Sequence, residues 1–61
     1  MGKWLQEERK KAEMTQREAA AAARISQPSY CLIEQGKRNP TVETAKRIAK
    51  AMGFAWTRFF E

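Results

Sequence analysis

Two cations stand side by side in a short loop that ends at a proline, where residues 36–40 read Gly-Lys-Arg-Asn-Pro. Gly36 can adopt the left-handed conformation in which many helices end, so Lys37 and Arg38 are expected to follow a helix C-terminus. Cationic side chains form strong, charge-assisted hydrogen bonds with phosphate oxygens. The loop is therefore predicted to bind phosphate.

Two helix-start signals precede this loop and define the elements that must position it. Thr15 and Glu18 have the spacing of a capping box, in which each side chain accepts a hydrogen bond from the backbone N–H of the other residue. Ser26 is a second N-cap residue. We therefore expect helices over about 16–23 and 27–35, joined by a very short turn. A pair of helices of this size can lay its second helix in the major groove of DNA.

Three further helices are expected around this pair. Apolar residues recur at helical spacing over about 3–12 and 42–52, and Thr41 is the N-cap residue of the second segment. Residues 55–61 read as the first turns of a fifth helix, and no strand-like alternation appears in the sequence. The sequence therefore predicts an all-α fold of five helices in one domain, residues 1–61.

The expected core is short of large side chains, because the helix at 16–23 offers only alanines. Close packing requires volume from elsewhere, so Tyr30 is predicted to point inward over these alanines. Its hydroxyl then needs a hydrogen-bond partner or an exit to water. Among the C-terminal aromatic residues, Trp56 and Phe60 are expected inside and Phe59 partly outside. The inward stripe predicted for the fourth helix is Val42, Ala45, Ile48, Ala49 and Met52.

The composition excludes several classes of site. The chain has no histidine and a single cysteine, Cys31, which rules out an internal disulfide, a multi-cysteine metal site and catalysis by histidine. Neither a cofactor nor a metal is expected, and no set of nucleophile, base and oxyanion donors indicates an enzyme. No apolar run approaches the roughly 20 residues of a membrane span, so a cytoplasmic location is expected. The net charge of +5 is consistent with a polyanionic partner or with a solvated basic surface.

The order of these signals resembles a known family. Residues 34–40, Glu-Gln-Gly-Lys-Arg-Asn-Pro, are similar to the E-x-G-x-R-x-P stretch of phage lambda-type repressors and Cro proteins, which belong to the XRE family of phage and bacterial helix-turn-helix regulators. Thr15-Gln16 stands at the expected distance before this stretch, and the resemblance extends over about residues 5–60. It implies a five-helix, lambda-repressor-like bundle in which the helix at 27–35 is the recognition helix.

The resemblance also implies roles for single residues. Gln16, at the start of its helix, would contact a DNA phosphate together with the helix N-terminus. Arg9 and Glu34 match a pair that links the first helix to the third in several relatives. A carboxylate at a helix C-terminus needs such a cation because it opposes the macrodipole. The residues expected along the DNA backbone are Gln16, Gln35, Lys37, Arg38 and Asn39.

The recognition helix departs from the family pattern, in which the positions corresponding to 27, 28, 31 and 32 commonly carry polar side chains that contact bases. Two of these residues here, Pro28 and Leu32, have no hydrogen-bond donor in the side chain. Gln27 can pair with an adenine through two hydrogen bonds, and Ser29 is a further candidate for a polar contact. Pro28 and Leu32 can touch thymine methyl groups or press against a protein. The positions expected to contact bases or a partner are Gln27, Pro28, Ser29, Cys31 and Leu32.

Two functional hypotheses follow. In the first, the chain is a sequence-specific transcriptional regulator that inserts helix 27–35 into the major groove of double-stranded DNA and places loop 35–39 on phosphates. In the second, it is a small modulator or anti-repressor that binds another repressor protein through the apolar face of Pro28, Cys31 and Leu32. A homodimer formed through the C-terminal aromatic segment is a further expectation.

Three residues outside the recognition helix also depart from the family pattern. Arg24 stands where a glycine often occupies the turn after the second helix, so a positive φ at this position would strain it. Glu8 and Glu13 replace residues that are often apolar or glycine, and both are expected to be solvated.

Overall fold

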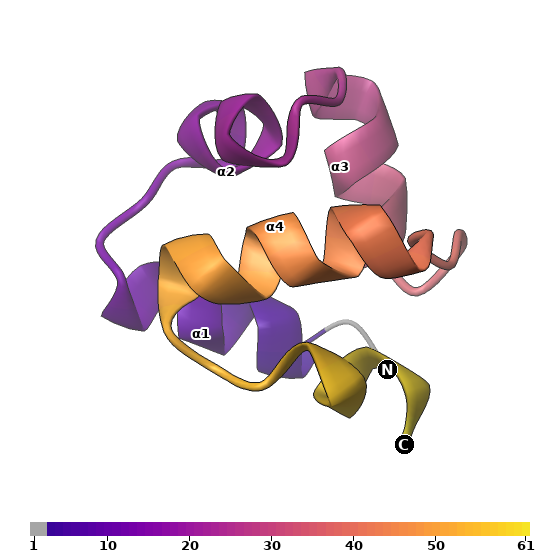
Figure 1. The fold of residues 1–61 in the computed structure, drawn as a ribbon. Coiled ribbons are helices and arrows are strands. Elements are labelled where there is room, and N and C mark those ends of the chain that lie inside the picture. The colour runs from indigo at the N-terminus through magenta and orange to yellow at the C-terminus, as the bar shows by residue number, and fades with distance from the viewer. Residues whose placement is uncertain (1–2) are drawn as a thin grey trace.

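The computed structural model describes residues 3–61, which form α-helices and one short 3-10 helix, with no strand among them (Figure 1). The elements in chain order are α1 (Lys3–Lys11), α2 (Gln16–Ala23), α3 (Gln27–Glu34), α4 (Val42–Met52) and η1 (Trp56–Phe60). The all-α prediction is confirmed, and the predicted fifth helix forms as the 3-10 helix η1. None of the helices in this part of the chain is long and apolar enough to cross a membrane.

α4 is the central element of the bundle. In Figure 1, α2 and α3 lie above α4, while α1 and η1 lie below it. α2 packs against both α3 and α4, α1 contacts α3 and α4, and η1 contacts α4. Because the turn between α2 and α3 spans only residues 24–26, these two helices are held as a compact pair on one side of α4.

The helix-start signals of the sequence form as hydrogen bonds. Thr15 Oγ1 accepts a hydrogen bond from the backbone N–H of Glu18 at 3.1 Å, and Glu18 Oε1 accepts one from the N–H of Thr15 at 2.8 Å. This is the predicted capping box at the start of α2. Ser26 and Thr41 cap α3 and α4 through their hydroxyl groups, as predicted. The start of each of these three helices is therefore fixed by local chemistry.

Arg24 ends α2 in the left-handed conformation, with a φ of 61° and a ψ of 39°. Its backbone N–H donates to the carbonyl oxygen of Ala21 at 3.1 Å, and the N–H of Ile25 donates to that of Ala20 at 3.1 Å. These bonds close the turn between α2 and α3. A residue with a Cβ atom is strained in this conformation, so Arg24 destabilises the turn that it forms.

Arg24→Gly is therefore expected to stabilise the protein by about 1 kcal/mol, because the strain it relieves outweighs the greater freedom of glycine in the unfolded chain. Urea unfolding followed by tryptophan fluorescence measures the change. Arg24→Ala is the matched control, since it removes the same charge but keeps the strained backbone. The prediction is wrong if the glycine variant unfolds at the same urea concentration as the alanine variant.

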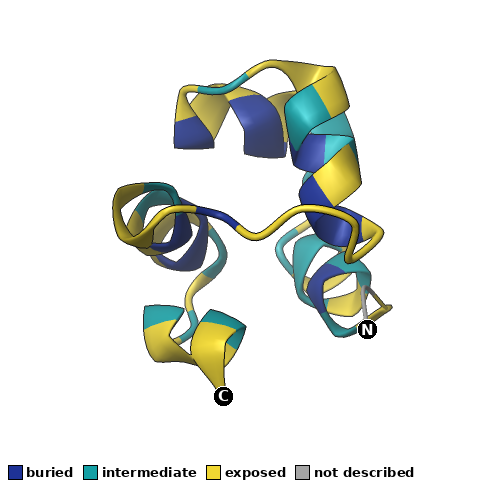
Figure 2. Ribbon diagram, turned by 90° about the vertical axis from the view of Figure 1, so that its right-hand side faces the viewer, coloured by how far each residue is buried: buried dark blue, intermediate teal, exposed yellow. Residues whose placement is uncertain are grey.

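Side chains from all four α-helices form one core, and the buried segments of the helices turn toward one another in Figure 2. Tyr30 is fully buried, as predicted. The alanines of α2 are too small to fill this space themselves, so the tyrosine ring supplies much of the volume. The buried cluster consists of Leu5, Ala19, Ala20, Ala23, Tyr30, Ile33 and Ile48.

Two residues that were predicted to face inward are exposed. Val42 is 49% exposed, because it is the first residue of α4 and lies at the edge of the packed region. Phe60 is 51% exposed, and Phe59 packs instead on Trp4, with the ring centroids 5.1 Å apart. Trp56 still meets Phe60, with ring centroids 6.1 Å apart, and this pair lies at the outer edge of η1. Phe59 is the residue of η1 that reaches Trp4 and Phe54, so it takes the inner place predicted for Phe60.

An ion pair joins α1 to η1. Arg58 Nη1 lies 2.8 Å from Glu8 Oε2, and the Arg58 guanidinium lies 4.5 Å from the centroid of a Trp4 ring. The prediction that Glu8 is solvated is therefore wrong, because η1 folds back toward α1 and brings Arg58 to this carboxylate. Glu13 is exposed, as expected.

Candidate nucleic-acid interface

α3 is anchored on one side and open on the other. Tyr30, Ile33 and Glu34 are buried and form the inner face of the helix. Each residue turns the helix by about 100°, so the outer positions form one continuous band. This band, called the α3 stripe below, consists of Gln27, Pro28, Cys31, Leu32 and Gln35. The fold thus brings five of the predicted site residues together on one surface.

Ser29 lies beside the α3 stripe and is half-buried. Its hydroxyl accepts a hydrogen bond from Ser26 Oγ at 2.9 Å and one from Arg38 Nη1 at 3.3 Å. In the structure, the Ser29 hydroxyl therefore contacts the N-cap residue of α3 and Arg38 of the following loop.

The loop that follows α3 presents its cations on the surface. Gly36 has a φ of 78°, the left-handed conformation expected at this helix end. Lys37, Arg38 and Asn39 are all exposed. Pro40 is buried and holds the end of the loop against the core. Because Arg38 also contacts α3 through Ser29, the loop is fixed at both ends.

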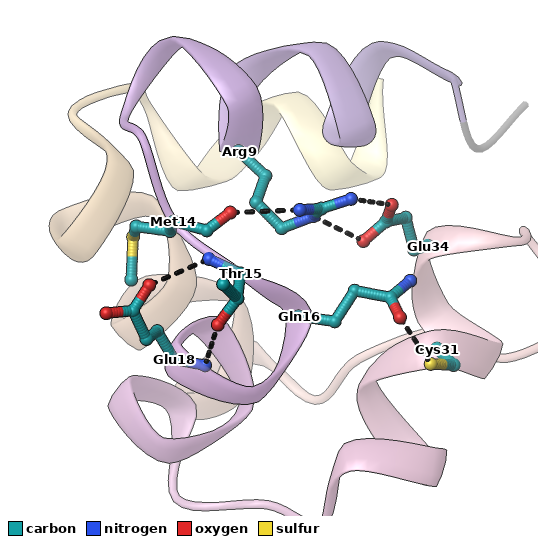
Figure 3. A network of polar contacts seen from close by, with 7 residues as sticks. All are labelled: Arg9, Met14, Thr15, Gln16, Glu18, Cys31 and Glu34. Atoms are coloured by element: carbon teal, nitrogen blue, oxygen red, sulfur yellow. Dashed lines mark hydrogen bonds and ion pairs between the residues drawn. The ribbon is translucent and has the colours of Figure 1, made fainter.

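Gln16, the first residue of α2, contacts the α3 stripe directly. The Cys31 thiol donates a hydrogen bond to Gln16 Oε1, with the two atoms 3.2 Å apart. The amide nitrogen of Gln16 then lies on the side of Glu34 (Figure 3). The first backbone N–H groups of α2 have no partner within the helix and concentrate positive potential at the same point. The start of α2 is therefore a donor-rich site next to the exposed face of α3.

Arg9 ties α1, the start of α2 and the end of α3 together. Its Nε and Nη2 atoms donate to Glu34 Oε2 and Oε1, each at 3.1 Å, and its Nη1 donates to the carbonyl oxygen of Met14 at 2.9 Å (Figure 3). The two charged side chains are only 12% and 6% exposed. The hydrogen bonds to Glu34 raise the pKa of Arg9, so the guanidinium stays charged. Since Met14 directly precedes the N-cap of α2, this contact fixes the position of Gln16 relative to α3.

Tyr30 is buried next to this ion pair. Burial raises the pKa of the Tyr30 hydroxyl, and the negative charge of Glu34 raises it further, while Arg9 acts in the opposite direction. The hydroxyl is therefore neutral at ordinary pH. It has no hydrogen-bond partner among the residues that the structure describes. A buried hydroxyl in this state costs folding free energy.

Tyr30→Phe is accordingly expected to stabilise the fold by about 1 kcal/mol, because an unsatisfied buried polar group costs ~1–3 kcal/mol and the ring that fills the core is retained. Thermal and urea unfolding of the two proteins under identical conditions measure the difference. A phenylalanine variant that is less stable than the wild type by a similar amount would contradict the account, since it would mean that the hydroxyl is hydrogen-bonded.

The sequence did not indicate three polar residues that lie at this surface. Lys3 and Gln6 of α1 line one hollow together with Gln16 and Gln35. Arg17 lines a second hollow, which also contains Gln16 and Gln27. The i, i+3 spacing of Lys3 and Gln6 places them on one side of α1, but only the packing of α1 against α3 brings that side to the interface.

Comparison with known proteins agrees with this geometry. The family model described as helix-turn-helix matches residues 5–59. This chain belongs to the helix-turn-helix family. The resemblance predicted from residues 34–40 is therefore confirmed. The uncharacterized HTH-type transcriptional regulator YqaF of Bacillus subtilis is 46% identical to this helix-turn-helix chain over 61 residues, which are 100% of the chain and 80% of that relative. No solved structure matches the chain.

The surface of this helix-turn-helix protein around the α3 stripe is rich in cations. Lys37 and Arg38 lie at one end of α3, and Lys3 and Arg17 lie near Gln16. Among the residues that line these two hollows, Glu34 is the one carboxylate, and it is already paired with Arg9. The surface can therefore attract a polyanion without first breaking an ion pair.

Proposed function

We propose that this helix-turn-helix protein is a sequence-specific transcriptional regulator that binds double-stranded DNA with α3 in the major groove. The observation that supports this most strongly is that donor groups flank α3 on both sides and contact it directly. Gln16 meets Cys31 at 3.2 Å, and Arg38 meets Ser29 at 3.3 Å. A helix seated in the major groove lies between two phosphate backbones, so donors on both of its flanks suit that position.

The proposed contacts divide into two kinds. Those with phosphates position the protein, and we assign them to Gln16, Gln35, Lys37, Arg38 and Asn39. Those with base edges read the sequence. Gln27 stands at the start of α3, where its amide can pair with an adenine, and Pro28 and Leu32 can contact thymine methyl groups. With a single strong polar reader, the preference for any one base sequence is expected to be modest.

The hypothesis of a modulator that binds another repressor gains no support from the family match or from the similar regulator. Leu32 is exposed on the α3 stripe, but an apolar side chain at this position is equally suited to thymine methyl groups.

Selection of binding sequences from a random pool of duplex DNA tests the proposal. The wild-type protein is expected to enrich a defined sequence, and Gln27→Ala is expected to relax it at one adenine, with a loss of about 1–3 kcal/mol of discrimination there. Gln16→Ala is the matched control. It removes a phosphate contact and should weaken binding while leaving the selected sequence unchanged. If the wild-type protein enriches no sequence at all, the proposal of sequence-specific binding is wrong.

A further inference from the structure

A hollow lies between the first turn of α1 and the last turn of α3, beside the start of α2. The residues that line it are Lys3, Gln6, Gln16, Glu34 and Gln35. Four of these five side chains carry N–H donors, one as an ammonium group and three as amides. The hollow is thus built almost entirely from groups that bind an anion.

The single carboxylate in the hollow does not cancel this character. Both oxygens of Glu34 accept hydrogen bonds from Arg9 at 3.1 Å, so its charge and its acceptors are already used. Lys3 forms no ion pair with any residue that the structure describes. A positive charge without a counter-charge therefore stands at the rim of a concave, donor-lined surface.

The orientation of Gln16 adds to this arrangement. Because its Oε1 atom is bound to the Cys31 thiol, its NH2 group is turned to the side of Glu34, which lines the hollow (Figure 3). Gln35, the last residue of the α3 stripe, lines the same hollow. The hollow is therefore continuous with the surface that we assign to DNA.

From these observations we infer that the hollow binds a phosphate of the DNA backbone, with Lys3 supplying the charge and Gln6 and Gln35 supplying hydrogen bonds. The inference rests on the proposed function, because the phosphate belongs to the same duplex. It adds α1 to the DNA-binding surface, so that phosphate contacts continue from the start of α2 past the end of α3. Such a contact strengthens binding to all sequences alike and depends on salt.

The test compares Lys3→Ala with the wild type by fluorescence anisotropy on a labelled duplex, over a series of salt concentrations. Losing one phosphate contact lowers the slope of log affinity against log salt by about 0.9. The fall in affinity between about 50 and 200 mM salt should then become ~3.5-fold smaller. Lys50→Ala, which removes the same charge from the exposed side of α4, should leave the slope unchanged. Ethylation interference identifies the phosphates whose modification blocks binding. Lys3→Ala should show one such phosphate fewer than the wild type, and Lys50→Ala should show the same phosphates as the wild type.

Lys3→Gln provides a second variant, which keeps an N–H donor but removes the charge, and it should show the same reduced slope. The inference is overturned if the wild type binds with a steep salt dependence while the Lys3 and Lys50 variants have equal slopes and identical ethylation patterns. In that case the proposed function stands. Failure of the wild type to bind duplex DNA at low salt overturns the proposed function and this inference together.

Discussion

Arg9→Met is expected to lower the free energy of unfolding by about 3–5 kcal/mol, because it leaves a buried carboxylate without its cation. Glu34 is 6% exposed and would lose both of its hydrogen bonds from Arg9. The carbonyl oxygen of Met14 would lose its donor as well. Small domains are stable by only about 5–15 kcal/mol, so this loss would remove a large share of the total stability. Urea unfolding monitored by tryptophan fluorescence measures the loss.

The paired variant Arg9→Met with Glu34→Leu is the control for this prediction. Replacing both partners by apolar residues is often neutral, so most of the lost stability should return. Recovery in the double variant would attribute the effect to the unpaired charge rather than to lost packing of the Arg9 stem. If Arg9→Met alone unfolds at the wild-type urea concentration, Arg9 does not hold α1, α2 and α3 together as described.

The double variant Lys37→Ala/Arg38→Ala should weaken binding to every DNA sequence while leaving the fold intact. Both residues are exposed, and each is proposed to contact a phosphate. The loss of two phosphate contacts lowers the salt slope by about 1.8, so the fall in affinity between about 50 and 200 mM salt becomes ~12-fold smaller. Anisotropy titrations on a selected site and on a random duplex measure the effect, and both duplexes should respond equally.

Lys46→Ala/Lys50→Ala is the matched control for this double variant. It removes the same two charges from exposed positions of α4, where none of the proposed contact residues lies. Long-range attraction between exposed charges is largely screened beyond about 10 Å at 0.1 M salt, so this variant should keep a nearly wild-type slope. Equal losses in the two double variants would mean that net charge, rather than the loop after α3, determines binding.

The sequence predicts the helix bounds well because the signals that set them are local. The Thr15–Glu18 capping box and the N-cap residues Ser26 and Thr41 each act on a backbone N–H three residues away, and their hydrogen bonds form as expected. Tyr30 could be placed inside for a different reason. The alanines of α2 leave a volume in the core that a large neighbouring side chain must fill.

Other features depend on contacts that sequence spacing does not reveal. Glu8 and Arg58 are 50 positions apart, and only the return of η1 toward α1 brings them together. Phe59 rather than Phe60 packs inward because it meets Trp4, at the other end of the chain, and Phe54. Lys3 reaches the candidate interface through the packing of α1 on α3. The residues predicted for α3 and its loop lie together on one surface, whereas the sequence did not indicate that Lys3 and Gln6 of α1 and Arg17 of α2 lie beside them.

We propose that the surface around α3 binds DNA through phosphate contacts. The most direct test of this proposal is an anisotropy titration of the wild-type protein with labelled random-sequence duplex DNA at about 50 and 200 mM salt. We expect measurable binding at low salt that falls steeply at the higher concentration, since each phosphate contact adds about −0.9 to the salt slope. Absence of binding at low salt, or an affinity that is the same at both concentrations, would contradict the proposal.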